Sequence, residues 1–150
     1  MSEWADEFFR VWQQAWTTGT EAVLEHVTDD IEFWDVTLSE PLRGIQAYAE
    51  HCDNFFAAFS EIIWWEREPV LHEPGTNRAA EPWAFEGLND GPLWIGLPAT
   101  GRRLKTTGTD IFEFRDEKVC REHSYYDVVS SLRQMGMWPG MDSRTEKMLM

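Results

Sequence analysis

The stretch Pro98–Gly136 constrains the fold most, because it combines two strand patterns, a tight turn and the start of a helix. From Leu104 onward, alternate residues share one face of a strand. That face carries Leu104, Thr106, Gly108, Asp110, Phe112 and Phe114. A carboxylate among phenylalanines is costly to bury unless it is paired or protonated. Asp110 is therefore the first candidate for a functional residue.

The turn Arg115–Lys118 leads into a second predicted strand, Val119–Tyr126. Alternation predicts one shared face for Val119, Arg121, His123, Tyr125 and Asp127. Three titratable groups and a tyrosine on one side of a strand fit a polar site better than a plain core. A structural interpretation stays open, in which Asp110 forms a buried salt bridge with Arg121 or His123.

The composition narrows the class of protein. A chain of 150 residues is enough for one domain. We expect a single domain over residues 1–137. The C-terminal tail, residues 138–150, is expected to be irregular or packed on a partner. Nine Trp and nine Phe suffice for a core and for the walls of a flat hydrophobic cavity. A net charge of −14 argues against binding nucleic acid or an anionic membrane.

The same sequence predicts a soluble, cytoplasmic protein. The acidic N-terminus lacks the basic region of a signal peptide, and no apolar run approaches membrane-spanning length. Cys52 and Cys120 show no metal-binding spacing, and His26, His51 and His72 look like surface or loop residues. We therefore expect no metal site and no cofactor.

The first third of the chain predicts two helices and a strand. Ser2 is placed to cap a helix that runs to about Thr17, with an aromatic stripe formed by Trp4, Phe8, Trp12 and Trp16. That stripe fits core packing, or a pocket wall built from Trp12 or Trp16. A short helix, Glu21–Val27, and a strand, Asp30–Val36, follow. Asp35 shares a strand face with Ile31 and Phe33, as Asp110 does with its phenylalanines, or it ends the strand in a turn.

The middle of the chain predicts a covering helix and more strands. The helix begins at Ile45 and carries an apolar stripe as far as Phe59. The predicted strands are Glu61–Leu71, Arg78–Glu86 and Leu93–Leu97, and Pro82 indicates an edge or a bulge in the second. This order favours an α+β fold in which helices cover one face of a curved, mostly antiparallel sheet.

The C-terminal half also resembles a known family. Pro98-Ala99-Thr100-Gly101-Arg102-Arg103, Gly108–Phe114, Glu122-His123, Asp127 and Gln134-Met135-Gly136 follow in the order and spacing of the SnoaL-like polyketide cyclases, within the nuclear-transport-factor-two-like superfamily. The resemblance implies a cone-shaped α+β barrel whose curved sheet wraps around N-terminal helices. It also implies a hydrophobic pocket at the mouth, a homodimer formed through the exposed sheet face, and Asp127 as general acid/base.

A second, partial resemblance involves Asp30–Gly44, which is similar to the corresponding segment of ketosteroid isomerases. It implies that Asp35 abstracts a proton and that a protonated Asp110 donates a hydrogen bond to the developing oxyanion. Trp12 stands where those isomerases place a tyrosine.

These patterns together predict acid/base catalysis without a cofactor. An aspartate takes a proton from the carbon next to a carbonyl group of a hydrophobic, polyketide-like or polycyclic substrate, as in aldol cyclisation, isomerisation or dehydration. The candidate catalytic residues are Asp35, Asp110, Asp127 and His123, and the candidate substrate-binding residues are Trp12, Trp34, Trp83 and Tyr125.

Several alternatives remain open at this point. Asp127 is also a good N-cap for the last helix, and His123 also fits a structural histidine of the barrel. A non-catalytic protein that binds small molecules would use the same pocket. A dimerising structural domain would have its barrel mouth filled by its own side chains.

Overall fold

The computed structural model describes residues 3–150, so the predicted cap at Ser2 lies outside the described residues. The helices are α1 (Glu3–Thr18), α2 (Thr20–Leu24), α3 (Ile45–Ala58), α4 (Val128–Gln134) and α5 (Arg144–Leu149). The strands are β1 (Val27–Asp35), β2 (Leu42–Arg43), β3 (Phe59–Glu66), β4 (Leu71–His72), β5 (Arg78–Asn89), β6 (Arg102–Arg115) and β7 (Lys118–Tyr126). The break between α1 and α2 falls at Gly19, whose φ of 147° favours glycine.

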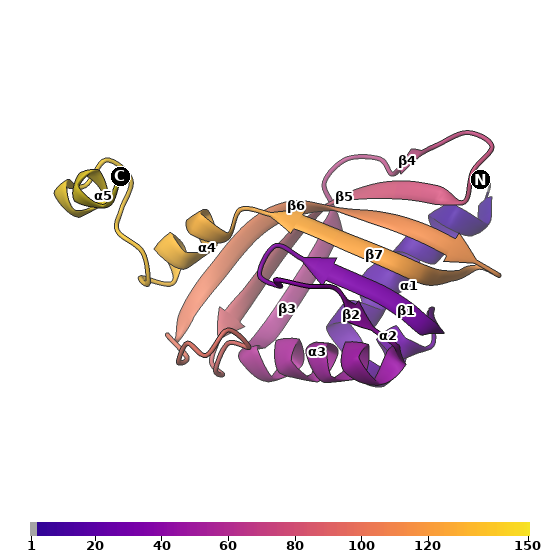
Figure 1. Ribbon diagram of the computed structural model, residues 1–150, viewed down its shortest axis with the longest axis horizontal. Helices are drawn as coiled ribbons and strands as arrows, with labels where there is room; N and C mark the ends of the chain where they lie inside the picture. The colour runs from indigo at the N-terminus through magenta and orange to yellow at the C-terminus, as the bar shows by residue number, and fades with distance from the viewer. Residues whose placement is uncertain (1–2) are drawn as a thin grey trace.

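The strands form one curved sheet in the order β2-β1-β7-β6-β5-β3, with β4 paired to β5 (Figure 1). All pairs are antiparallel except β1 with β7. The N-terminal helices and α3 pack against the inner face of this sheet. The predicted fold, an α+β architecture with a curved, mostly antiparallel sheet around N-terminal helices, is confirmed, although the sheet does not close on itself.

The inner face is apolar and aromatic, as the alternation predicts. On β6, Leu104, Asp110, Phe112 and Phe114 are buried while Ile111 is exposed. On β1, Ile31, Phe33 and Asp35 are buried. The N-terminal aromatic stripe packs on this face, because Phe8 contacts Phe114 and Trp12 contacts Phe112 through edge-to-face rings.

Some predicted boundaries are wrong. The strand predicted over Glu61–Leu71 ends at Glu66, and β4 is a separate, two-residue strand. On one edge of β5, Trp83 and later residues pair with β3, whereas Ala79 and Ala80 pair with β4. Pro82 lies between these two sets, so its missing N–H removes no hydrogen bond from either pairing. The segment predicted as strand Leu93–Leu97 is a turn, closed by a hydrogen bond from the Leu93 N–H to the Leu97 carbonyl at 2.8 Å.

Strand β7 contains a bulge that the sequence did not predict. Phe114 pairs with Val119, but the preceding residue of β6, Glu113, pairs with Arg121, so Cys120 is an extra residue on β7. An extra residue moves every later side chain to the opposite face of the sheet. Val119 therefore points inward, whereas Arg121, His123 and Tyr125 point outward, and Glu122 and Ser124 are buried instead.

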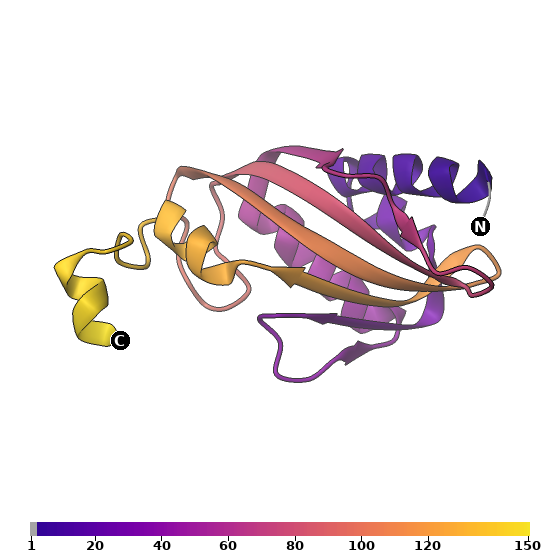
Figure 2. The ribbon, with the colours of Figure 1, turned by 90° about the horizontal axis from the view of Figure 1, so that it is seen from above.

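The C-terminal tail stands away from the rest of the fold (Figure 2). It is not wholly irregular, because α5 is capped by Ser143, whose hydroxyl accepts a hydrogen bond from the Glu146 N–H at 3.1 Å. An ion pair between Arg133 of α4 and Glu146 joins the tail to the domain. Within residues 3–150, no helix combines the length and the apolar character needed to cross a membrane.

Candidate active site

A cavity opens between the inner face of the sheet, α1, α3 and α4. Its volume is about 130 Å³, roughly ten times what one water molecule needs, about 10–15 Å³. The walls are mainly aromatic: Trp12, Trp16, Phe33, Phe55, Phe59, Trp64, Trp83, Phe85 and Trp94. The barrel mouth is therefore not filled by its own side chains, and the prediction of a plugged structural domain is wrong.

Asp110 lies on the inner wall, where β6 carries it into the cavity. The indole N–H of Trp83, on the neighbouring strand β5, donates a hydrogen bond of 2.7 Å to its carboxylate. Burial raises the pKa of Asp110 to about 6, and hydrogen bonds from Ser124, Trp83 and Glu122 limit that rise. The alternative in which Asp110 pairs with Arg121 or His123 is wrong, because both side chains lie on the other face of the sheet.

Glu122 lies beside Asp110 and is 2% exposed. The Tyr48 hydroxyl, from α3, donates a hydrogen bond of 2.7 Å to its carboxyl group. Burial, then the charge of Asp110, raises the pKa of Glu122 well above its ordinary value. Both effects favour the neutral form of Glu122, which is the form that can donate a hydrogen bond to the Asp110 carboxylate.

Glu81 is a third buried acid in the cavity, 2% exposed, on β5 directly opposite Asp110. Its carboxyl oxygen accepts a hydrogen bond of 2.7 Å from the Gln13 side chain of α1. Burial, followed by the charge of Asp110, raises the pKa of Glu81 to about 8.

Asp35 is the fourth acid that lines the cavity. It ends β1 and accepts hydrogen bonds from the Thr37 backbone N–H at 2.7 Å and hydroxyl at 2.5 Å, so its predicted turn role is confirmed. The Tyr126 hydroxyl donates to its other oxygen at 3.3 Å. Burial raises the pKa of Tyr126, which stays protonated. His51, predicted at the surface, is instead buried near Asp35, and burial lowers the pKa of its imidazole.

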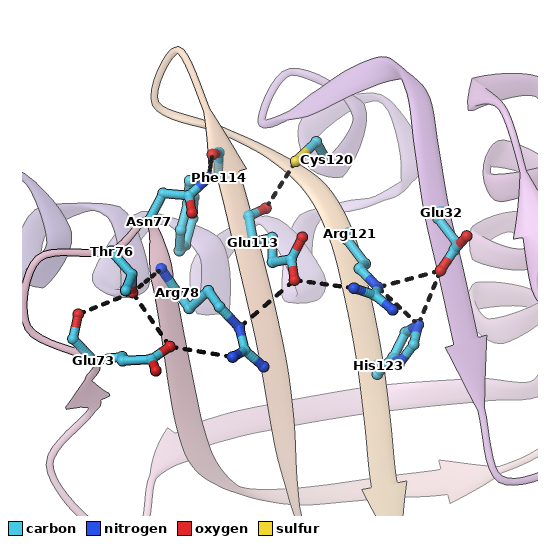
Figure 3. Close-up of polar contacts among 10 residues, drawn as sticks. All are labelled: Glu32, Glu73, Thr76, Asn77, Arg78, Glu113, Phe114, Cys120, Arg121 and His123. Atoms are coloured by element: carbon cyan, nitrogen blue, oxygen red, sulfur yellow. Dashed lines mark hydrogen bonds and ion pairs between the residues drawn. The ribbon is translucent and has the colours of Figure 1, made fainter.

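The bulge in β7 places several predicted site residues outside the cavity. His123 contacts Glu32 at 3.2 Å and belongs to a network of charges on the outer face of the sheet (Figure 3). Trp34 packs against His123 and Tyr125 on that same outer face. The structure thus brings His123, Trp34 and Tyr125 together, but away from Asp110.

Asp127 lies at the N-terminus of α4 and is exposed. Its side chain accepts a hydrogen bond of 2.9 Å from the Ser130 N–H, so the N-cap interpretation is confirmed. Of the eight predicted site residues, the cavity walls contain Asp35, Asp110, Trp12 and Trp83.

The cavity combines four acids with no basic side chain of the Lys or Arg type among its lining residues, all of which are described. In residues 3–150, no cluster of three or more His, Cys, Asp or Glu residues has the geometry to hold a metal ion. What the arrangement provides is the buried carboxyl group of Asp110, that of Glu122 beside it with its neutral form favoured, and a tyrosine hydroxyl, all held against aromatic walls. Such groups accept and donate protons in surroundings from which water is largely excluded.

Comparisons with known proteins agree with this architecture. The family model described as SnoaL-like polyketide cyclase matches residues 6–135. No curated protein matches the sequence significantly.

Solved structures show the same fold at low sequence identity. TsrD from Streptomyces laurentii superposes with a TM-score of 0.77 at 18% identity, covering 91% of this chain and 98% of that one. A protein from Jannaschia sp. CCS1, described as a SnoaL-like polyketide cyclase, gives 0.76 at 16%, covering 91% and 93%. A protein with a ketosteroid isomerase-like fold from Catenulispora acidiphila, solved with trimethylamine, gives 0.72 at 16%, covering 89% and 94%.

Proposed function

Because this chain belongs to the SnoaL-like polyketide cyclase family, we propose that it catalyses cofactor-free proton transfer next to a carbonyl group of a hydrophobic, polyketide-like or polycyclic substrate. One observation carries the proposal: Asp110 is buried in an apolar cavity, yet its pKa of about 6 leaves it mostly ionised at neutral pH. A base with such a pKa is stronger than an ordinary aspartate and still available in its charged form.

Asp110 is the proton acceptor in this proposal. Its carboxylate takes a proton from the carbon next to the carbonyl, and the electron pair of the broken C–H bond forms an enolate. The Trp83 N–H, which donates to Asp110, fixes the orientation of the carboxylate. Neutral Glu122, beside it, stabilises its charge.

Tyr126 is the donor for the enolate oxygen. Its hydroxyl lines the cavity and remains protonated, and it turns from Asp35 to the substrate oxygen as negative charge develops there. If the enolate is conjugated with a double bond, it takes the proton back from Asp110 at a different carbon, which is isomerisation. Alternatively it attacks a second carbonyl, and the alkoxide that forms takes the proton from Asp110, which is aldol cyclisation.

Exchange of carbonyl-adjacent protons in D2O tests this function directly. With 2-tetralone as a flat ketone, NMR should show exchange catalysed by the parent protein, and Asp110→Asn should slow it by at least about 100-fold. Asp127→Asn is the matched control, since asparagine also caps helices, and it should leave the rate unchanged. If Asp110→Asn exchanges as fast as the parent, Asp110 is not the base; if the parent shows no exchange, the cavity binds without catalysing.

We also propose that the protein forms a homodimer through the outer face of the sheet. Apolar side chains are exposed there on three strands, namely Ile63, Trp65, Ile111 and Tyr125. Beside them, arginines and glutamates alternate (Figure 3), and a patch that carries both charges can be self-complementary across a two-fold interface. Sedimentation should show a dimer that Tyr125→Glu dissociates, and a monomeric parent would contradict the proposal.

A further inference from the structure

Glu81 is a buried acid to which the proton transfer assigns no role. Within residues 3–150, the hydrogen bond from Gln13 is the only one that its carboxyl group receives, and it reaches one of the two oxygens. Burying a carboxyl group with so few partners is costly, and a glutamine or an apolar residue would fill the same wall more cheaply. Its presence in the cavity therefore indicates a ligand group that pairs with it.

The neighbours of Glu81 indicate the charge of that group. Glu81 stands directly opposite Asp110 in the β5–β6 ladder, and Glu122 lies on the next strand, β7. Like charges directly opposite one another destabilise a sheet. No described Lys or Arg forms an ion pair with any of the three acids. The negative charge of these three acids is therefore balanced either by bound protons or by a cationic ligand.

The wall next to Glu81 is built from indoles. Trp83 lies two residues along β5 on the same inward face. Its ring centroid is 5.0 Å from that of Trp64, which is 6.3 Å from that of Trp16 on α1. Gln13, the partner of Glu81, lies one helical turn before Trp16. Indole faces attract cations more strongly than other aromatic rings do, and this attraction is independent of the carboxyl groups.

We propose that Glu81 and the indoles of Trp16, Trp64 and Trp83 form a subsite for a cationic nitrogen, so that the substrate carries a protonated or quaternary amine as well as its carbonyl group. The inference rests on the proposed function for the carbonyl half of the substrate. Hydrophobic ketones with an anionic substituent are disfavoured by the same cavity. The net charge of −14 adds a long-range attraction for cations.

Two probes of the same shape test the subsite. The 3-hydroxyphenyltrimethylammonium ion and 3-tert-butylphenol differ by a nitrogen in place of a carbon, and so by one positive charge. Calorimetric titration of the parent protein should show the cation binding at least about tenfold more tightly, a difference of about 1.4 kcal/mol. Equal affinities, or tighter binding of the neutral phenol, would overturn the proposal, and this comparison needs no variant.

Glu81→Gln tests whether the preference for the cation arises from Glu81. Glu81→Gln should weaken binding of the cation by at least about tenfold and leave binding of the neutral phenol as in the parent. Glu113→Gln, the same substitution on the outer face of β6, is the matched control and should change neither affinity. Equal losses for both probes in Glu81→Gln would mean that Glu81 only shapes the wall.

The outcome is separable from that of the proton-transfer proposal. 2-Tetralone carries no positive charge, so its exchange tests the proton transfer and not the preference for a cation. A preference for the cation without exchange would support the cationic subsite and contradict the proposed proton transfer. Exchange without a preference for the cation would support the proton transfer and contradict the subsite.

Discussion

The indole N–H of Trp83 donates a 2.7 Å hydrogen bond to the carboxylate of Asp110 across the β5–β6 pair. Both side chains point into the cavity. This contact holds a negative charge where burial alone would neutralise it, and it couples the aromatic wall to the proposed base.

Removing the Trp83 donor should raise the pKa of Asp110. Trp83→Phe keeps an aromatic ring in the wall but deletes the N–H, which stabilises the charged form of the carboxylate. The midpoint of the pH dependence of 2-tetralone exchange should therefore shift upward from about 6. Trp34→Phe, on the outer face, should not shift it, and a downward shift in Trp83→Phe would contradict the role of this bond.

Substitution of Gly108 should destabilise the protein because the Trp83 indole packs against its backbone. A Cβ at this position would lie 2.3 Å from Cζ2 of Trp83 and 2.6 Å from the Tyr125 carbonyl oxygen. Gly108→Ala should displace the indole and lower the free energy of unfolding by about 1–3 kcal/mol in urea denaturation. Gly140→Ala, where nothing lies within 4 Å of the added Cβ, is the control and should unfold as the parent does.

Tyr126→Phe should slow exchange without changing the midpoint of its pH profile. The substitution removes the hydroxyl proposed to stabilise the enolate, and loss of one such donor typically costs about 10²–10³ in rate. Tyr125→Phe changes the neighbouring residue, whose side chain is on the outer face, and should have no effect. An unaffected rate in Tyr126→Phe would assign the oxyanion donor to another group.

Glu81 should make the protein less stable as pH rises. Its pKa is about 8 when folded and near 4.5 when unfolded, so the folded state holds the extra proton between these values. The resulting stabilisation is complete below about pH 4.5 and is lost as pH rises through about 8. Urea denaturation should show that Glu81→Gln reduces the fall in unfolding free energy across this window, by up to about 1.4 kcal/mol per pH unit. A slope as steep as that of the parent would place Glu81 in water, not in the cavity.

The alternation along β1 and β6 was sufficient to predict that Asp35 and Asp110 face the interior. The register of β6 with β5 is unbroken, and that of β1 with β7 is unbroken from Glu32 to Asp35, after an irregularity between Val27 and Glu32. The same reasoning identifies Glu81, which is in phase with Trp83 and Phe85 on β5. Likewise, His51 lies at helical spacing from Tyr48 and Phe55. The signals for Glu81 and His51 were present in the sequence and were missed.

The residues of β7 were not predictable in this way. The bulge at Cys120 is a feature of the pairing between β7 and β6, so it cannot be detected from the alternation of apolar and polar residues within β7 alone. Every assignment after it was therefore inverted: His123 and Tyr125 were expected inside, whereas Glu122 and Ser124 are the buried residues. Tyr48, the partner of Glu122, comes from α3 and meets it only in three dimensions.

The most direct test is an NMR titration of the Asp110 side-chain carboxyl carbon, assigned by its disappearance in Asp110→Asn. A carboxyl group held in a desolvated cavity between Trp83 and Glu122 should titrate with a midpoint near 6, well above the ordinary value of 3.8. A midpoint at or below 3.8 would show that water reaches this carboxylate freely, and the account of Asp110 as a base tuned by burial would be wrong.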